Sequence, residues 1–451
     1  MTYKNHNLEL SYQRKSSNSV RIGQVAIGHN HPIVVQSMVD TSTNDIEASV
    51  KQSIALIESG AQMIRYTTQG SREVNNLSVI KSIIRQHYDT PIIADVHFRA
   101  DIADEAAIVA DKVRINPGNY AHDIHTFNTR FRHFLSLCKR HNVAVRIGVN
   151  HGSLSKRILE QYGNTQQAMI ESCLEFLQVA YQEDFSNVVL SVKSSDTRIM
   201  YETVKQLYQT LYEQNLLYPI HLGVTEAGFG EDGRIKSAVG IGACLSQGIG
   251  DTIRVSLSED PCEEIPVAQH IISYFTLPTS NRYNQVHVTK EDGAIIYESS
   301  CSTWDHFVLE AAAETGHLLW DENCSILTLK NKNFSSKLLK RLEKDILQAA
   351  GIVRYKNEYV VCPGCGRTMF NLHQVAQEVK NATQHLSGLK IAIMGCIVNG
   401  IGEMGNADYG YVGAGANKIS LYKNQKCVLT NIPQEQAVEC LLEIIQNDKI
   451  K

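Results

Sequence analysis

Short β-branched runs alternate with longer amphipathic segments over the first 278 residues. The apolar runs open near Ile33, Met63, Pro91, Lys112, Ala144, Asn187, Ile220 and Asp251. The first amphipathic segment is stopped by Gly60 and has its large apolar residues at the helical period, namely Ile46, Val50, Ile54 and Ile57. Eight strands, each followed by a helix, predict an α/β fold with a (β/α)8 TIM barrel over about residues 30–278. An open doubly wound sheet is the alternative, but such sheets rarely reach eight units.

The sequence on either side of the barrel segment has a different pattern. Residues 1 to about 30 are polar, with a short hairpin predicted over 20–28. Beyond the barrel, polar residues 278–281 predict a linker. A strand, a helix, a second strand and a second helix then follow at 294–297, 304–320, 325–329 and 338–350. We assign residues 1–278 to the barrel domain and residues 279–357 to a small insert or spacer domain.

Residues 358–451 show a third pattern. Their order is strand, cysteine turn, helix, strand, cysteine loop, further strands and a final helix. This order predicts a C-terminal α+β domain over 358–451.

Composition places the chain in a broad class. It has 451 residues, 43% of them hydrophobic and 20% charged, and a net charge of −4, as in a soluble globular protein and unlike a basic nucleic-acid binder. Membrane spans need about 18 consecutive apolar residues, and neither such a run nor a secretory signal core occurs in the sequence. Eleven cysteines, an odd number, fit a reducing compartment. We therefore expect a cytoplasmic protein with no nucleic-acid or membrane partner.

Cations recur in the predicted barrel strands. Five strands carry one in an otherwise apolar run: Arg65, Arg114, Arg146, Lys193 and Arg254. A buried cation costs several kcal/mol unless an anion meets it. These side chains could face solvent or pair with local acids. If they point into the barrel mouth, they predict a positive site suited to a substrate with two phosphates.

Uncharged polar residues and two carboxylates lie near these cations in the sequence. The polar residues, each with the alternative of a turn or cap role, are Asn116, Asn150, Ser153, Ser194, Thr225 and Ser256. Asp95 and Glu226 lie close to the ends of their strands. A carboxylate beside so many cations should stay ionised and available as a base. The alternative for both is a salt bridge to the arginines.

The candidate metal ligands follow the insert. Cys362 and Cys365 form a C-x-x-C turn, Cys396 follows an apolar run that predicts a buried strand, and Glu403 lies beyond a glycine-rich loop. A zinc site would need four ligands, with His373 or Cys427 completing the set. An iron–sulfur cluster with three thiolates and one further ligand is the competing interpretation. A disulfide does not fit the odd cysteine count without a secretory signal.

Longer motifs carry a family resemblance. C-P-G-C-G-R-T and M-G-C-I-V-N-G-I-G-E resemble the cluster domain of the 4-hydroxy-3-methylbut-2-en-1-yl diphosphate synthase family, and the barrel motifs I-R-Y-T-T-Q-G, V-R-I-G-V-N-H-G-S and G-V-T-E-A-G resemble its barrel. The resemblance covers about residues 15–278 and 358–425. One departure is Ile401, where the family usually has proline, which puts the exact position of Glu403 in question. Members of the family lack the 279–357 insert or carry a larger one, so we expect a reduced insert that acts as a spacer.

The resemblance implies a set of roles. A 4Fe-4S cluster would be held by Cys362, Cys365, Cys396 and Glu403. The substrate diphosphate would be held by Arg65, Arg114, Arg146, Lys193 and Arg254, assisted by Asn116, Asn150, Ser153 and Ser256. The catalytic groups would be Asp95 and Glu226, with Glu403 as a displaceable ligand and His97 as a weaker candidate.

The resemblance also implies a reaction. It is the reductive ring opening of 2-C-methyl-D-erythritol 2,4-cyclodiphosphate to 4-hydroxy-3-methylbut-2-enyl diphosphate, a step of isoprenoid biosynthesis, with electrons from ferredoxin or flavodoxin. The rival interpretations are a non-catalytic iron–sulfur sensor of a phosphorylated metabolite and a zinc-stabilised barrel transferase. The sequence leaves open a homodimer, and whether the cluster domain serves its own barrel or a neighbour's.

Overall fold

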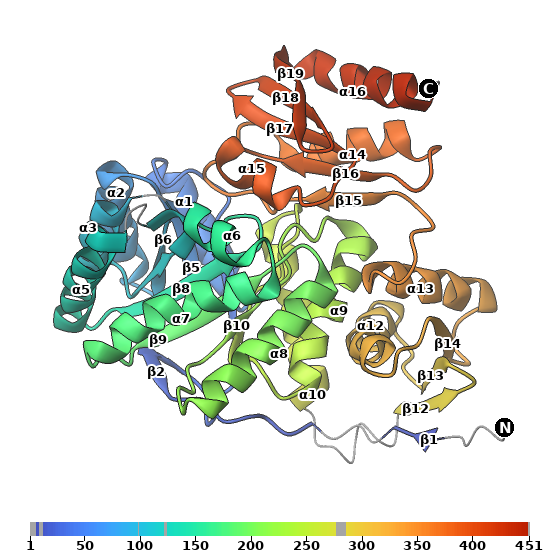
Figure 1. Cartoon of the computed structure of the whole chain (residues 1–451), viewed down its shortest axis with the longest axis horizontal. Helices are drawn as coiled ribbons and strands as arrows, with labels where there is room; N and C mark the ends of the chain where they lie inside the picture. Colours follow the sequence, from blue (N-terminus) through green and yellow to red (C-terminus); the bar gives the residue numbers. More distant parts are fainter. Residues whose placement is uncertain (1–5, 9–11, 98, 121–123, 277–285, 450–451) are drawn as a thin grey trace.

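The computed structural model describes residues 6–8, 12–97, 99–120, 124–276 and 286–449. Its largest part is a closed barrel of parallel strands (Figure 1). The strands are β4 (Val34–Met38), β5 (Met63–Thr68), β6 (Ile92–Val96), β7 (Lys112–Ile115), β8 (Ala144–Asn150), β9 (Val188–Lys193), β10 (His221–Leu222) and β11 (Thr252–Ile253). A parallel bridge between Leu190 and Ile220 joins β9 to β10 and closes the ring. The predicted (β/α)8 barrel is confirmed.

Helices cover the outside of the barrel. They are α1 (Ile46–Glu58), α2 (Ser71–Ile84), α3 (Ala100–Val109), α4 (Pro117–Tyr120), α5 (Ile124–His141), α6 (Lys156–Tyr162), α7 (Gln166–Gln182), α8 (Thr197–Glu213), α9 (Gly230–Ser246) and α10 (Glu264–Thr276), with a 3-10 turn η1 (Pro261–Glu263) before α10. Local chemistry sets the ends of α1: the Asp45 side chain accepts a hydrogen bond from the Ala48 amide at 3.0 Å, and Gly60 follows with φ +106°. The predicted stop at Gly60 is confirmed.

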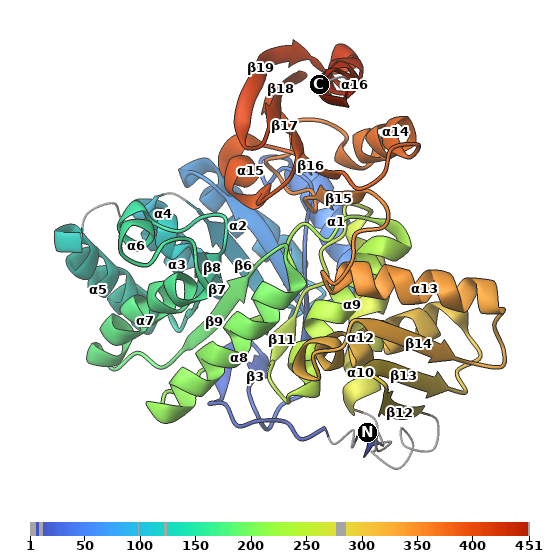
Figure 2. The same ribbon diagram turned by 45° about the vertical axis from the view of Figure 1, so that its right-hand side comes forward.

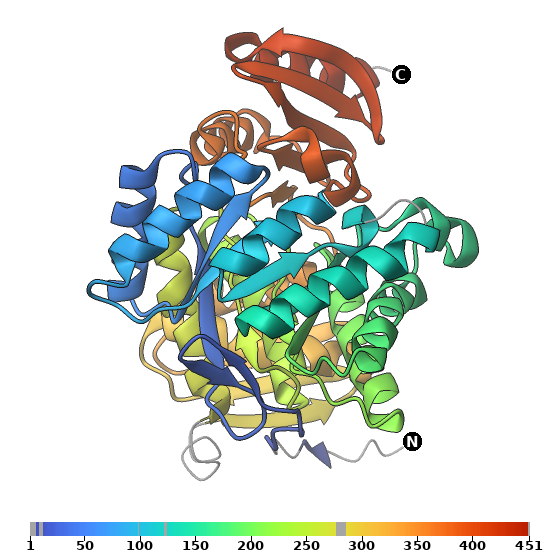
Figure 3. The same ribbon diagram turned by 90° about the vertical axis from the view of Figure 1, so that its left-hand side faces the viewer.

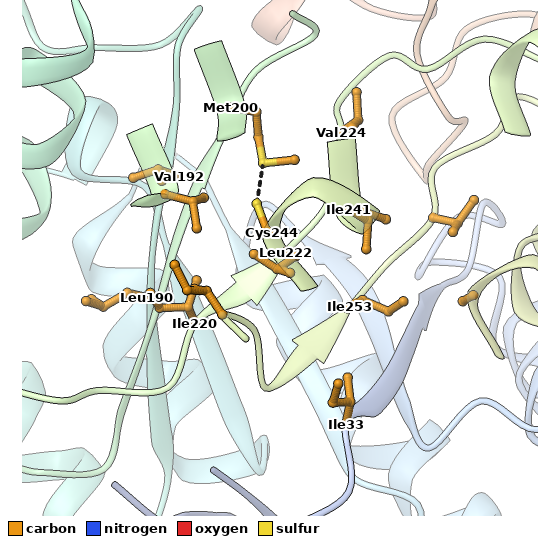
Figure 4. Close-up of a cluster of buried hydrophobic side chains, with 14 of the residues drawn as sticks. Ile33, Leu190, Val192, Met200, Ile220, Leu222, Val224, Ile241, Cys244 and Ile253 are labelled. Carbon is orange, nitrogen blue, oxygen red and sulfur yellow. Dashed lines mark hydrogen bonds between the residues drawn. The ribbon is translucent and has the colours of Figure 1, made fainter. Parts of the chain in front are cut away.

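Apolar side chains fill the layer between the barrel strands and their helices (Figure 4). Leu222 of β10 lies beside Cys244 of α9, Leu190 of β9 lies beside Ile220, and all four are buried. The Cys244 thiol lies 3.9 Å from the Met200 sulfur. Cys244 therefore serves as a small apolar core residue.

A short hairpin closes one end of the barrel. It consists of β2 (Val20–Ile22) and β3 (Val25–Ile27), as the sequence predicted, and is drawn in dark blue in Figure 3. Val20, Ile22 and Ile27 pack against Met63 and Ala144 at the starts of two barrel strands. Only the opposite end, where the strands finish, remains for a functional site.

The insert is packed against the barrel (Figure 2). It comprises β12 (Val286–Glu291), β13 (Ala294–Ser299), α12 (Trp304–Asp321), β14 (Ile326–Lys330) and α13 (Ser336–Ala349). Helix α12 lies so close to α9 that a Cβ added at Gly242 would be 2.5 Å from the Ala313 Cα. The insert is therefore firmly docked and does more than separate two domains.

The N-terminus also contributes to the insert. Strand β1 (His6–Asn7) pairs antiparallel with β12, so these two residues extend the sheet of the insert. A two-residue strand is too short to show a pattern in the sequence, and its partner is almost three hundred residues away. The linker expected at 278–281 lies outside the described residues.

The C-terminal domain is a mixed sheet with helices. Its elements are β15 (Glu358–Val361), α14 (Leu372–Thr383), β16 (Lys390–Met394), α15 (Ile397–Glu403), β17 (Tyr409–Gly415), β18 (Lys418–Lys423), β19 (Lys426–Pro433) and α16 (Gln434–Lys449). The sheet order β15-β16-β17-β18-β19 fits the predicted α+β domain. The glycine-rich segment after Cys396, expected to be a loop, is the helix α15. Gly400 is needed there for packing, because an added Cβ would be 2.8 Å from the Val412 side chain.

No helix in the described part of the chain is long and apolar enough to cross a membrane.

The docking of the insert gives a first prediction. Gly242→Ala should lower the free energy of unfolding by about 1–3 kcal/mol, because the new methyl group would force α9 and α12 apart. Gly415→Ala is the matched control, since an added Cβ there has no atom within 4 Å. Urea unfolding of the two variants tests this. Equal stability of both variants would show that the helix contact is looser than described.

Candidate active site

The open end of the barrel and the two cysteine segments line a single cavity. Its volume is about 110 Å³. The C-terminal domain covers this end of the barrel (Figure 1). Across the boundary, the Asn150 side-chain amide donates a hydrogen bond to Glu403 Oε1 at 2.8 Å, and Ala227 forms a parallel bridge with Val361. Within one chain, the cluster domain thus lies over its own barrel.

Three of the five predicted barrel cations have carboxylate partners. Arg65 Nη2 lies 2.7 Å from Asp95 Oδ2, and Arg114 Nη1 lies 3.2 Å from Asp95 Oδ1. Arg254 forms two contacts of 3.2 Å with Glu264 through Nε and Nη2. All three arginines line the cavity; Arg254 has a carboxylate of its own, whereas Arg65 and Arg114 share Asp95.

Arg146 and Lys193 have no carboxylate partner within the described residues. They are 2% and 6% exposed, and Nε and Nη1 of Arg146 are buried without a hydrogen-bond partner there. Burial lowers the pKa of Arg146, and the nearby Arg65 and Arg114 lower it further. Burial and the charge of Arg146 likewise lower the pKa of Lys193. Two cation-bearing side chains thus line the cavity without a balancing anion, as in an anion-binding site.

Asp95 is held as a carboxylate. Burial alone would raise its pKa, but Arg65 and Arg114 outweigh burial and hold the pKa well below its ordinary value. Asp95 itself is completely buried behind the arginines. The contacts of Asp95 are therefore salt bridges to Arg65 and Arg114, which was the alternative considered for this residue.

Glu226 is in a different environment from the one expected. It was expected to stay ionised beside cations, but burial and the neighbouring Glu403 raise its pKa well above the ordinary value. The raised pKa favours the protonated form of Glu226 beside Glu403. Glu226 also has φ +49°, a left-handed conformation that is unfavourable for a non-glycine residue and is common at functional sites.

The smaller polar residues divide into two groups. Asn150 and Ser256 line the cavity, as does Thr225, whose hydroxyl donates to Glu403 at 3.4 Å. Asn116 and Ser153 are bonded to each other, with the Asn116 amide 2.9 Å from the Ser153 hydroxyl. This pair joins the segments after β7 and β8, so both side chains are engaged in holding the loops.

His97 is close to the charged groups. Its Nε2 lies 2.8 Å from Arg114 Nη1, and burial followed by the Arg114 charge lowers its pKa well below the ordinary value. His97 is therefore neutral and accepts a hydrogen bond from Arg114.

The four predicted cluster ligands all line the same cavity: Cys362, Cys365, Cys396 and Glu403. The Gly395 amide donates a hydrogen bond to the Cys362 sulfur at 3.1 Å, as expected for a thiolate ligand. No three His, Cys, Asp or Glu side chains in the described ranges converge on one metal-ion position. A zinc ion requires such convergence, whereas a four-iron cluster binds each ligand through a different iron.

The residues proposed to complete a zinc site lie elsewhere. His373 is paired with Gln377 at 2.8 Å on the exposed side of α14, and Cys427 is exposed on β19. The donor set of three thiols and a carboxylate therefore fits an iron–sulfur cluster better than zinc.

Sequence reasoning missed one cavity residue, Arg367. It comes two residues after Cys365, and its Nη2 lies 3.6 Å from Asp95 Oδ2. The signal was present in the motif C-P-G-C-G-R-T, where the arginine directly follows the C-x-x-C turn and its glycine. Only the fold shows that it reaches the barrel.

Comparison with known proteins agrees with this geometry. A family model for the GcpE TIM-barrel domain matches residues 17–269, and one for the GcpE protein C-terminal domain matches residues 358–447. The 4-hydroxy-3-methylbut-2-en-1-yl diphosphate synthase (flavodoxin) of Parabacteroides distasonis is 37% identical, with 97% of this chain and 98% of the relative covered. The proteins of the same name from Akkermansia muciniphila and Chlamydia muridarum are 34% and 33% identical over 96% and 97% of this chain, and 97% and 98% of the relatives are covered.

The chain belongs to the 4-hydroxy-3-methylbut-2-en-1-yl diphosphate synthase family. The family resemblance and fold class predicted from the sequence are confirmed. The alignment with the P. distasonis relative runs over 602 positions, although this chain has 451 residues, so that family member carries segments absent here.

The unequal pairing of the cations gives a second prediction. Arg146→Leu should raise the free energy of unfolding of the metal-free protein by about 1–3 kcal/mol, because it removes a buried charge with no partner. Arg254→Leu should lower it by about 3–5 kcal/mol, because Glu264 would be left buried and unpaired. Urea unfolding of both variants is the measurement. Destabilisation of similar size in both would contradict the distinction between paired and unpaired cations.

Proposed function

We propose that this chain catalyses the reductive ring opening of 2-C-methyl-D-erythritol 2,4-cyclodiphosphate to 4-hydroxy-3-methylbut-2-enyl diphosphate. The proposal rests on one observation: cations without carboxylate partners and three cysteine thiols line the same cavity. The names of the relatives, which are synthases of this product, support a catalytic role over an iron–sulfur sensor.

The cofactor in this proposal is a 4Fe-4S cluster. Cys362, Cys365 and Cys396 would hold it, with Glu403 as the fourth ligand. When bound, such a cluster supplies electrons one at a time to the substrate. A carboxylate binds iron less firmly than a thiolate, so Glu403 is the ligand that the substrate could displace.

The barrel binds the substrate through its diphosphate. Arg146 and Lys193 provide the unpaired cations, and Arg65, Arg114 and Arg254 extend the positive surface around them. Asn150 and Ser256 donate hydrogen bonds from the cavity wall, while Asn116 and Ser153 keep the loops beneath it in place. Asp95 keeps two arginines oriented.

Loss of the substrate oxygen as water needs a proton as well as two electrons. Glu226 is suited to provide it, because its raised pKa keeps it protonated in the pair with Glu403. Glu226 lines the same cavity as Glu403, and this position supports a role in protonating the leaving oxygen. Asp95 is less suited, because its two arginines keep it ionised.

We infer that the electrons come from another protein. The segment Gly228–Gly233 matches G-x-G-x-x-G, but it follows a strand of the closed barrel and does not belong to the doubly wound fold in which this pattern binds a dinucleotide. The names of the relatives favour flavodoxin over ferredoxin as the donor. A reducing cytoplasm suits both the donor and the thiol ligands. A homodimer stays a prediction.

The proposal is tested by anaerobic purification. The protein should be brown, contain about four irons per chain, and convert the cyclic diphosphate to the open-chain product when given reduced flavodoxin. Cysteine-to-serine replacement at Cys396 should remove both iron and turnover, whereas Cys427→Ser, outside the cavity, should change neither. Stoichiometric zinc in a colourless preparation that is active would overturn the assignment.

Glu403 gives a further prediction. In Glu403→Cys, four thiolates should hold the cluster, so it should tolerate air better than the wild-type cluster. Turnover should fall at least about 100-fold, because the substrate cannot readily displace a thiolate. Glu403→Ala should give a labile cluster. Iron content, the rate of absorbance loss in air and turnover are the measurements. Full turnover by the cysteine variant would show that the fourth ligand position takes no part in the reaction.

A further inference from the structure

Arg367 belongs to the C-terminal domain but its side chain enters the barrel mouth. Its Nη2 lies 3.6 Å from Asp95 Oδ2, and the side chain is only 8% exposed. It lines the same cavity as Arg65, Arg114 and His97. It is thus a sixth cation of this cavity, and unlike the other five it comes from a different domain.

The existing contacts do not use the hydrogen-bonding capacity of Arg367. Its Nε and Nη1 are buried and have no hydrogen-bond partner among the described residues. Asp95, its one carboxylate neighbour, is already met by Arg65 and Arg114 at shorter distances of 2.7 and 3.2 Å. One carboxylate therefore faces three guanidinium groups, and positive charge is left over.

Other ion pairs already hold the two domains together. Lys380 on α14 of the C-terminal domain lies 3.6 Å from Asp232 on α9 of the barrel. Lys236 of the barrel pairs with Glu358 on β15 at 3.0 Å. These cations have carboxylate partners, as expected of ion pairs that fix one domain to another. Arg367 differs because its pairing is incomplete.

We propose that Arg367 is a substrate-binding residue that donates hydrogen bonds to the anionic oxygens of the bound diphosphate. The proposal rests on the function proposed above. Because Arg367 is carried by the C-terminal domain, the full cation set exists only when that domain covers the barrel. Diphosphate binding then favours the covered arrangement, since a ligand shifts a conformational equilibrium toward the state that it contacts best.

The same guanidinium group also lies near Cys365 and Cys396. It could instead act on the bound cluster, and the two roles are separable by experiment. A substrate-binding role changes the affinity for the diphosphate. A role toward the cluster changes its reduction potential and leaves that affinity unchanged.

Calorimetric titration of the anaerobic, cluster-loaded enzyme with the cyclic diphosphate, in the absence of reductant, tests the proposal. Arg367→Gln should weaken binding at least tenfold, and Arg367→Lys should fall between it and the wild type, because lysine keeps the charge but loses the bidentate geometry. Lys380→Gln is the matched control: it also removes a cation that the C-terminal domain presents to the barrel, but outside the cavity, and should change the affinity by less than threefold.

Small-angle scattering of the same samples gives a second readout. The substrate should make the wild-type enzyme more compact, and this response should be lost or reduced in Arg367→Gln.

Three outcomes would overturn the assignment. Unchanged affinity in Arg367→Gln with a shifted cluster potential would make Arg367 a residue that tunes the cluster. An equal loss of affinity in Lys380→Gln would show that any ion pair between the domains has the same effect. Wild-type enzyme that binds no cyclic diphosphate would overturn the proposed function, and this assignment with it.

Discussion

Buried positive charge without a matching carboxylate is concentrated at the mouth of the barrel. Arg146 and Lys193 are almost fully buried and lack carboxylate partners in the described residues, and burial lowers the pKa of each. Burying such side chains without partners costs free energy that the rest of the fold must offset. The closed ring of strands, the hairpin packed on its other end and the docked insert contribute to the fold that does so. An anionic ligand is the group that would complete this arrangement.

The C-terminal domain brings complementary chemistry to the same place. Three thiols and Glu403 line the cavity, and Glu403 accepts hydrogen bonds from Asn150 and Thr225 of the barrel. Glu226, whose pKa is raised by burial and by Glu403, contrasts with Asp95, which arginines keep ionised. Two carboxyl groups of one site thus have opposite protonation states because their surroundings differ. The left-handed backbone of Glu226 shows that the fold holds this carboxyl in place at a conformational cost.

Much of this arrangement could be predicted from the sequence, and the exceptions have physical reasons. Strands of a parallel barrel are covered on both faces, so they appear as continuous β-branched runs, and all eight were found. Strand β1 was missed because two residues carry no period. Helix α15 was expected to be a loop because its glycines suggested a turn, whereas Gly400 serves close packing. The cations were found as a set, but sequence alone could not show that Arg254 is paired with Glu264 while Arg146 is unpaired.

The central claim is that a diphosphate supplies the charge missing beside Arg146. The most direct test is thermal unfolding of the anaerobic enzyme with and without the cyclic diphosphate, for the wild type and for Arg146→Leu. A ligand at 100 times its Kd stabilises the native state by about 2.7 kcal/mol, so we predict a rise of several degrees in the wild-type Tm and almost none in the variant. An equal rise in both proteins would contradict the account.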